Sequence, residues 1–165
     1  MGQYWIPVNL DKREYVDPHK LGTGLKLWEQ IANHPSTGVA LLILCAAMPE
    51  ARGGGDLEPD PIIGRWAGDR IAIIGDYAED DDLTPKAGDP PAGQLYFMCR
   101  SDAEWRELVE DWQKDNPLLY ERAIREKWAP FKDVTDDVCR VIENELDGKF
   151  TGDGWRHFER NKEAA

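Results

Sequence analysis

The chain has 165 residues, of which 41% are hydrophobic, and a formal net charge of −12. A chain of this length buries about 70% of the surface that it exposes when unfolded, so it needs no disulfide framework or structural metal to fold. The acidic excess argues against direct binding to nucleic acid or to anionic membranes and favours a basic protein partner. Three cysteines without a Cys-x-x-Cys spacing favour free thiols, and we expect an unanchored, cytoplasmic protein.

The amino-terminal residues predict a β-hairpin followed by a short helix. Residues 4–10 alternate large and small side chains, and a second short run follows at residues 14–16. Apolar residues then recur near helical spacing, which predicts a helix over residues 24–33 that ends before Pro35. We expect Trp28 on this helix to pack against the core.

The apolar run at residues 39–48 fits either a buried strand or a buried helix, because periodicity does not separate the two. We favour a central strand for residues 39–45, where Val, Leu and Ile dominate after Gly38. Residues 49–61 contain three consecutive glycines and several prolines, which predicts a mobile loop.

Two further strands are predicted in the middle of the chain. Residues 70–74 form a short apolar run, and residues 94–99 place Leu95, Phe97 and Cys99 on one face. An acidic loop that contains prolines joins them over residues 76–91.

Three helices are predicted in the last third of the chain. The first begins with the capping box Ser101-x-x-Glu104 and continues with apolar residues at positions 105, 108, 109 and 112. Asn116-Pro117 begins a second helix that runs to about residue 128. Thr135 begins a third helix, which ends before Gly148.

These elements predict an α+β fold, because strands precede helices without βαβ alternation. We expect an N-terminal hairpin within a mixed or antiparallel sheet of about five strands, packed against an N-terminal helix and three C-terminal helices. Residues 1–150 are expected to form a single domain, and residues 151–165 a frayed tail.

The sequence offers no pattern typical of a catalytic or metal site. Neither of the two serines, Ser36 and Ser101, lies in a Gly-x-Ser-x-Gly motif, and the three histidines lack zinc spacing. The cysteines lie in or beside apolar runs, where burial makes a thiol inert. The acidic run at residues 79–82 lacks the alternating ligands of a calcium loop. We therefore predict no catalytic residue, metal or cofactor.

Residues 64–77 combine glycine, aromatic and charged residues around a short strand, which suits a binding edge. The candidate ligand-binding or partner-binding residues are Arg65, Trp66, Asp69, Arg70, Asp76 and Tyr77. An Arg-Asp pair beside a tryptophan can clamp a planar or charged ligand. The alternative is a structural turn in which Asp69 caps the backbone and Trp66 covers the core. We predict that residues 64–77 line the most ligand-like concavity, with Arg65, Asp69 and Arg70 near its mouth.

The negative charge is concentrated in the middle of the chain, where residues 49–115 hold 17 acidic and 7 basic residues. This excess predicts an acidic interaction surface, although charged runs also serve only to keep a protein in solution. Its candidate residues are Asp80, Asp81, Asp82, Glu104, Glu107 and Asp111.

Three motifs carry a resemblance to a known family: MGQYW with VNLDKREY near the amino terminus, GLKLWE at residues 24–29, and GRWAGDRI with GDY within residues 64–77. On these motifs the chain resembles an uncharacterised family of small proteins from bacteria, their phages and some fungi. The resemblance implies kinship alone, because this family has no assigned activity or catalytic residues.

Two hypotheses about function follow. The first is a non-enzymatic acidic binding protein of the inhibitor, immunity or host-defence-modulating type, which engages a basic protein through charge complementarity. The second is a protein that binds or processes a small ligand or nucleotide with the segment from Arg65 to Asp76. The sequence does not specify an oligomeric state.

Overall fold

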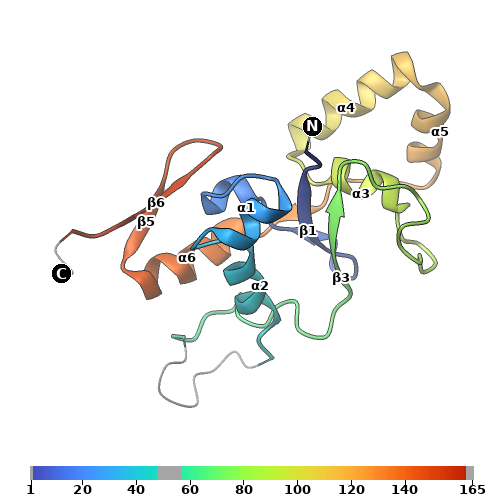
Figure 1. Cartoon of the computed structure of the whole chain (residues 1–165). Coiled ribbons are helices and arrows are strands. Elements are labelled where there is room, and N and C mark those ends of the chain that lie inside the picture. The colour runs from blue at the N-terminus through green and yellow to red at the C-terminus, as the bar shows by residue number, and fades with distance from the viewer. Residues whose placement is uncertain (1, 48–56, 163–165) are drawn as a thin grey trace.

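The computed structural model describes residues 2–47 and 57–162, and its fold is α+β (Figure 1). Residues 48–56, which include the three consecutive glycines of the predicted mobile loop, lie outside the described residues. The same holds for the last three residues of the predicted tail.

The central sheet is built around strand β1. Its strands, in the order in which they lie side by side, are β3 (Ile71–Gly75), β1 (Trp5–Asn9), β2 (Glu14–Tyr15) and β4 (Lys132–Asp133). β1 pairs antiparallel with both β2 and β3, whereas β2 and β4 run parallel. The predicted N-terminal hairpin and the strand near residues 70–74 are therefore confirmed.

Two segments that the sequence predicts as strands are helices in the structure. Residues 39–45 belong to α2 (Thr37–Cys45), in which Ala40, Ile43 and Leu44 are buried. Since buried residues three and four apart lie on one helical face, α2 satisfies its core contacts without joining the sheet. The strand prediction was wrong because the run is apolar at almost every position and has no distinct period.

The second corrected strand is the segment at residues 94–99, which lies in α3 (Ala92–Met98). Its buried residues are Ala92, Leu95 and Met98, spaced by three. The alternation of Leu95, Phe97 and Cys99 suggested a strand, yet Phe97 is only half-buried. Without these two segments the central sheet has four strands among the described residues rather than about five.

The N-terminal helix is shorter than expected, and it buries Gln30 rather than the predicted Trp28. A 3₁₀ turn, η1 (Pro18–Leu21), precedes α1 (Leu27–Ala32). The buried residue of α1 is Gln30, whose amide donates to the backbone carbonyls of Trp5 and Leu25. Trp28 is 73% exposed, so the prediction that it packs against the core was wrong.

The three C-terminal helices are confirmed as α4 (Asp102–Asp115), α5 (Pro117–Arg125) and α6 (Thr135–Leu146). Ser101 caps α4, and its hydroxyl accepts from the Glu104 amide at 3.2 Å. Asn116 caps α5, and its side chain accepts from the Leu119 amide at 3.3 Å. α6 buries an apolar stripe against η1 and α2.

β5 (Gly148–Thr151) and β6 (His157–Arg160) form a hairpin, so the predicted tail from residue 151 onward contains β6 and the last residue of β5. Phe150 and Phe158 pair across it with ring centroids 5.0 Å apart. The Trp155 ring stacks on His19 of η1 at 4.7 Å, and the Arg156 amide donates to the His19 carbonyl. These contacts join the hairpin to η1.

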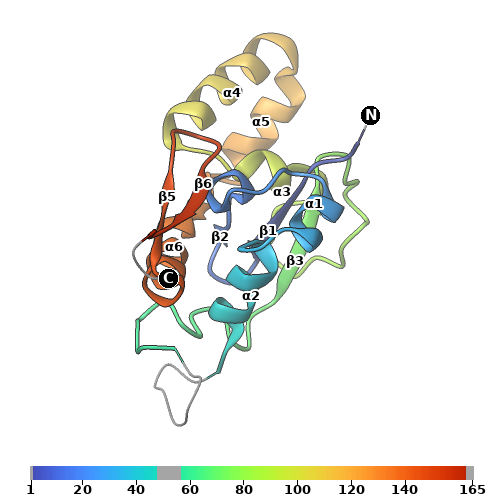
Figure 2. The ribbon, with the colours of Figure 1, turned by 60° about the vertical axis from the view of Figure 1, so that its left-hand side comes forward.

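The elements form two regions that share the sheet. One core cluster is centred on α2, α6 and residues 62–66, and the other on β1, β3, α3 and α4. Figures 1 and 2 both show the α4–α5 pair at one end of the molecule and α2 with α6 towards the other. None of the described helices is long and apolar enough to cross a bilayer.

Candidate functional site

The turn before β3 packs against the hairpin of β1 and β2 through a buried carboxylate. Glu14 is only 2% exposed, and both its oxygens accept from Arg65 Nε, at 2.8 and 3.0 Å. Trp66 is fully buried, and its indole nitrogen donates to the same carboxylate at 2.9 Å. The Trp66 ring is therefore enclosed in the core, where it has no face on which a ligand could stack.

Asp69 and Arg70 are also engaged within the protein. Asp69 accepts from Asn9 at 2.8 Å and pairs with Lys12, and these contacts lower the pKa of its carboxyl group. Arg70 pairs with Asp11 and Asp89, each at 2.8 Å. Through hydrogen bonds, Arg70 lowers the pKa of both partner carboxyl groups.

The last two candidates of this segment lie beyond β3. The Asp76 carboxylate accepts from the Tyr4 amide at 2.9 Å, and Tyr77 is exposed. Four concavities lined entirely by described residues have no wall residue between positions 64 and 77. Trp66 covers the core as in the structural-turn interpretation, whereas the Asp69 carboxylate accepts from the side chains of Asn9 and Lys12 rather than from backbone amides. The charged groups of this segment hold the hairpin and β3 together.

The acidic residues of α4 surround a hollow of about 320 Å³. Glu104, Glu107 and Asp111 recur at intervals of three and four, so they follow one face of the helix. The remaining wall residues come from β1, from the end of α3 and from α4 itself: Ile6, Tyr96, Cys99, Arg100 and Leu108. The structure therefore brings together three of the six predicted acidic residues.

The three carboxylates of this hollow differ in their partners. Glu104 accepts from the Ser101 amide at 2.9 Å, and this hydrogen bond lowers the pKa of its carboxyl group. Glu107 and Asp111 are exposed and form no ion pair with any cation of the described residues. The hollow thus offers two free carboxylates beside a third that is held in the helix cap.

One cation lies in the wall of the hollow. Arg100 places its guanidinium carbon 5.9 Å from the centre of the Phe97 ring, and its buried Nε has no hydrogen-bond partner among the described residues. Counting the three carboxylates and this guanidinium, the hollow keeps a formal charge of −2. Its field therefore favours a cation over an anion.

The hollow lacks an activated nucleophile. Burial raises the pKa of the Cys99 thiol well above its ordinary value, and it raises the pKa of Tyr96 to about 12. Both groups are therefore protonated at neutral pH, and no histidine or serine lies in the wall. Within residues 2–47 and 57–162, no cluster of three His, Cys, Asp or Glu side chains is arranged to hold a metal ion.

The other three predicted acidic residues lie elsewhere. Asp80 pairs with Arg122 of α5 at 3.5 Å and lies against Gly93 at the start of α3, whereas Glu104 follows the end of that helix. Asp82 accepts from the Glu79 amide at 2.9 Å, and Asp81 is exposed. The predicted acidic surface is thus divided between the two ends of α3.

The cysteines are all free thiols. Cys139 is buried, and its pKa is raised to about 12 by burial. Cys45 is exposed, which corrects the expectation that the apolar run encloses it. Partial burial of the Cys45 thiol still raises its pKa above the ordinary value.

The sequence did not indicate that Tyr96 and Arg100 line the hollow. The strand predicted for residues 94–99 places Tyr96 on the face opposite Cys99 and ends before Arg100, so it does not bring these three wall residues together. In a helix, Cys99 and Arg100 lie three and four residues after Tyr96 and therefore share its face, so a helical interpretation of this segment would have grouped them.

Comparison with known proteins adds no relative, because no protein-family model, curated protein or solved structure matches this chain. Its function is therefore inferred from its own residues.

Proposed function

We propose that this protein is a non-enzymatic acidic binding protein that engages a basic protein through the hollow beside α4. The observation that carries this proposal is the pair of exposed carboxylates, Glu107 and Asp111, which border the hollow without an ion pair to any described cation. The charged groups of residues 65–70, in contrast, are neutralised by partners within the fold.

A lysine or arginine side chain of the partner fits this environment. Its charged end would lie between the carboxylates, and its aliphatic stem would contact Ile6 and Leu108 in the wall. Each exposed ion pair contributes only about 0.2–1 kcal/mol, so several basic residues of the partner must act together.

The charge of the whole chain supports rapid association with such a partner. A net charge of −12 attracts a basic protein over distances of about a Debye length, which raises the association rate. Inhibitors and immunity proteins that mask a basic surface of their target would use the same physics. We assign the protein to the cytoplasm because its three cysteines are free thiols.

A pull-down with matched charge variants tests the proposal. The protein is immobilised and exposed to a lysate at low ionic strength, and captured proteins are identified by mass spectrometry. We expect a basic protein that is released as salt shortens the Debye length from about 10 Å to about 3 Å. The variant Glu107→Gln/Asp111→Asn should capture several-fold less of it.

The matched control is Glu110→Gln/Asp115→Asn, which removes the same charge from α4 outside the hollow wall. This control should retain most of the capture. Equal losses in the two variants would show that total charge acts without this site. Capture that does not respond to salt would contradict an electrostatic interface altogether.

A further inference from the structure

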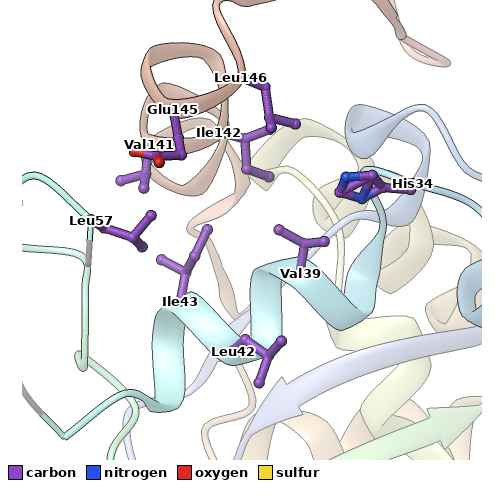
Figure 3. Close-up of a pocket in the computed structure, with 9 residues that line it drawn as sticks. All are labelled: His34, Val39, Leu42, Ile43, Leu57, Val141, Ile142, Glu145 and Leu146. Atoms are coloured by element: carbon purple, nitrogen blue, oxygen red, sulfur yellow. The ribbon is translucent and has the colours of Figure 1, made fainter. Parts of the chain in front are cut away.

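A second, mostly apolar cavity of about 230 Å³ lies between α2 and α6 (Figure 3). Figure 3 shows Val39 and Ile43 pointing from α2 towards the side chains of α6. The seven aliphatic wall residues are Val39, Leu42, Ile43, Leu57, Val141, Ile142 and Leu146, and the polar ones are His34 and Glu145. The cavity therefore presents a surface suited to a branched apolar group.

An acidic hollow of about 280 Å³ adjoins this cavity and shares the wall residues Val141 and Glu145 with it. Its other wall residues are Glu58, Pro59, Asp60, Arg140 and Asn144. The two concavities thus lie next to each other along α6 and share the wall formed by Val141 and Glu145, one of them apolar and the other polar; we refer to both together as the groove.

The charges of this groove are unequally compensated. Asp60 pairs with Arg140 at 2.9 Å, and this pair lowers the pKa of the Asp60 carboxyl group. Arg140 also pairs with Asp137 at 2.8 Å, so its guanidinium is fully engaged. Glu58 and Glu145 form no ion pair with a described residue. The groove consequently favours a cation beside its apolar cavity.

The lip of the cavity extends onto the open surface. Leu42 is 77% exposed, and in Figure 3 it projects away from the α6 side chains. A small ligand is usually enclosed over most of its surface, whereas this lip leaves apolar area outside the cavity. An occupant that covers both the cavity and its lip is therefore larger than the cavity itself.

Charge decides between a second copy and a different partner. A symmetric contact between two copies brings the same patch of each together, so Glu58 and Glu145 would face their own equivalents. Like charges opposite each other are unfavourable, and each copy carries a net charge of −12. A basic partner introduces neither the contact between like charges nor the repulsion between two acidic chains.

We propose that the groove between α2 and α6 binds a protein segment in which a branched apolar side chain is followed or preceded by lysine or arginine. The apolar side chain occupies the cavity, and the cation lies beside Glu145 and Glu58. This surface is separate from the hollow at α4, which lies at the other end of the molecule (Figure 2). The inference therefore does not depend on the proposed function of α4.

The probe is a fluorescent, end-blocked peptide with the core Lys-Leu-Lys, and binding to the full chain is followed by fluorescence polarisation. Replacing the peptide leucine with serine should weaken binding about tenfold, because the cavity loses its apolar occupant. Replacing both lysines with glutamate should abolish binding at low salt. Absence of binding by the Lys-Leu-Lys peptide, or equal binding of all three peptides, overturns the proposal.

Protein variants locate the site. Val39→Phe fills the cavity, and Glu58→Gln/Glu145→Gln removes the two carboxylates that form no ion pair with a described residue, so each should weaken peptide binding several-fold. The control Glu110→Gln/Asp115→Asn makes the same charge change on α4 and should bind as the wild type does. Because Val39→Phe risks unfolding, Leu42→Ser at the exposed lip supplies a second apolar test.

Two outcomes assign the groove to another occupant. If sedimentation shows a dimer that Leu42→Ser dissociates, the groove is an interface between copies and the proposal fails. If folded Val39→Phe and Leu42→Ser bind the peptide as tightly as the wild type, the peptide binds elsewhere and the proposal fails. Backbone NMR shifts confined to α2 and α6 on adding the peptide support it.

Discussion

Glu14 is the most constrained charged residue of the described structure, because its buried carboxylate accepts from both Arg65 and Trp66. A buried carboxylate is tolerated only while its hydrogen-bond donors remain in place. The ion pair therefore does more than join two charges, since it fixes the turn before β3 against the N-terminal hairpin.

We predict that Arg65→Met lowers the free energy of unfolding by about 3 kcal/mol, because it removes both guanidinium donors, Nε and Nη2, from the buried Glu14 carboxylate. Urea denaturation measures the change. The matched control is Arg122→Met, whose partners Glu126 and Asp80 are exposed, and it should cost less than about 1 kcal/mol. Equal effects of the two substitutions would mean that the Glu14 pair contributes no more than a surface pair.

Asp17 gives the fold a dependence on pH. Burial, together with the nearby Asp133 carboxylate, raises the pKa of Asp17 above its ordinary value. The hydrogen bond from the His19 amide and the charge of Lys20 act in the opposite direction. Because the folded state holds this proton more tightly than the unfolded chain, the free energy of unfolding begins to fall as the pH rises above the unfolded pKa, and the loss is complete above the folded pKa.

We therefore predict that Asp17→Asn raises the free energy of unfolding at pH 7 and that the gain disappears as the pH falls below about 4. Asparagine keeps the side-chain oxygen that accepts from the His19 amide at 3.0 Å. Urea denaturation across this pH range measures the difference. The exposed Asp153→Asn serves as the control, and an equal gain there would contradict the role of burial.

At the scale of the element, α4 depends on its capping box. The Ser101 hydroxyl accepts from the Glu104 amide, and the Glu104 carboxylate accepts from the Ser101 amide. The same cap fixes one of the three carboxylates of the hollow. Helix stability and site geometry are thus linked through Glu104.

We predict that Ser101→Ala lowers the free energy of unfolding by about 1 kcal/mol, as expected for a lost cap. Thermal unfolding followed by circular dichroism measures it. Ser101→Thr retains the hydroxyl and should unfold within a few degrees of the wild type. A neutral Ser101→Ala would indicate that packing of Trp105 alone holds the start of α4.

For the whole molecule, the distribution of buried residues predicts uneven stability. β1 pairs on both sides and is buried along most of its length, whereas Ala123 is the buried residue of α5. Leu118 and Ile124 of α5 are exposed. Local opening should therefore begin in α5 rather than in the sheet.

We predict that amides of α5 exchange with deuterium at least about a hundredfold faster than those of β1 and β3. Hydrogen exchange followed by mass spectrometry measures this difference. Protection of α5 equal to that of the sheet would show that its exposed apolar residues are covered in solution, and dilution would then reveal whether a second copy covers them.

The sequence alone determined the elements whose information is local: the hairpin at β1 and β2, the capped α4, and the amphipathic α6. It also identified the carboxylates of α4, because their spacing along a helix is visible in the chain.

Tertiary structure decided the rest. Whether residues 39–45 and 94–99 are strands or helices depends on which neighbours bury them, since their local patterns suit both. The hollow likewise exists only because the end of α3 brings Tyr96 and Arg100 against α4. The charges of residues 65–70 are satisfied by partners that are distant in the chain, from 19 positions away for Asp89 to 60 positions away for Asn9.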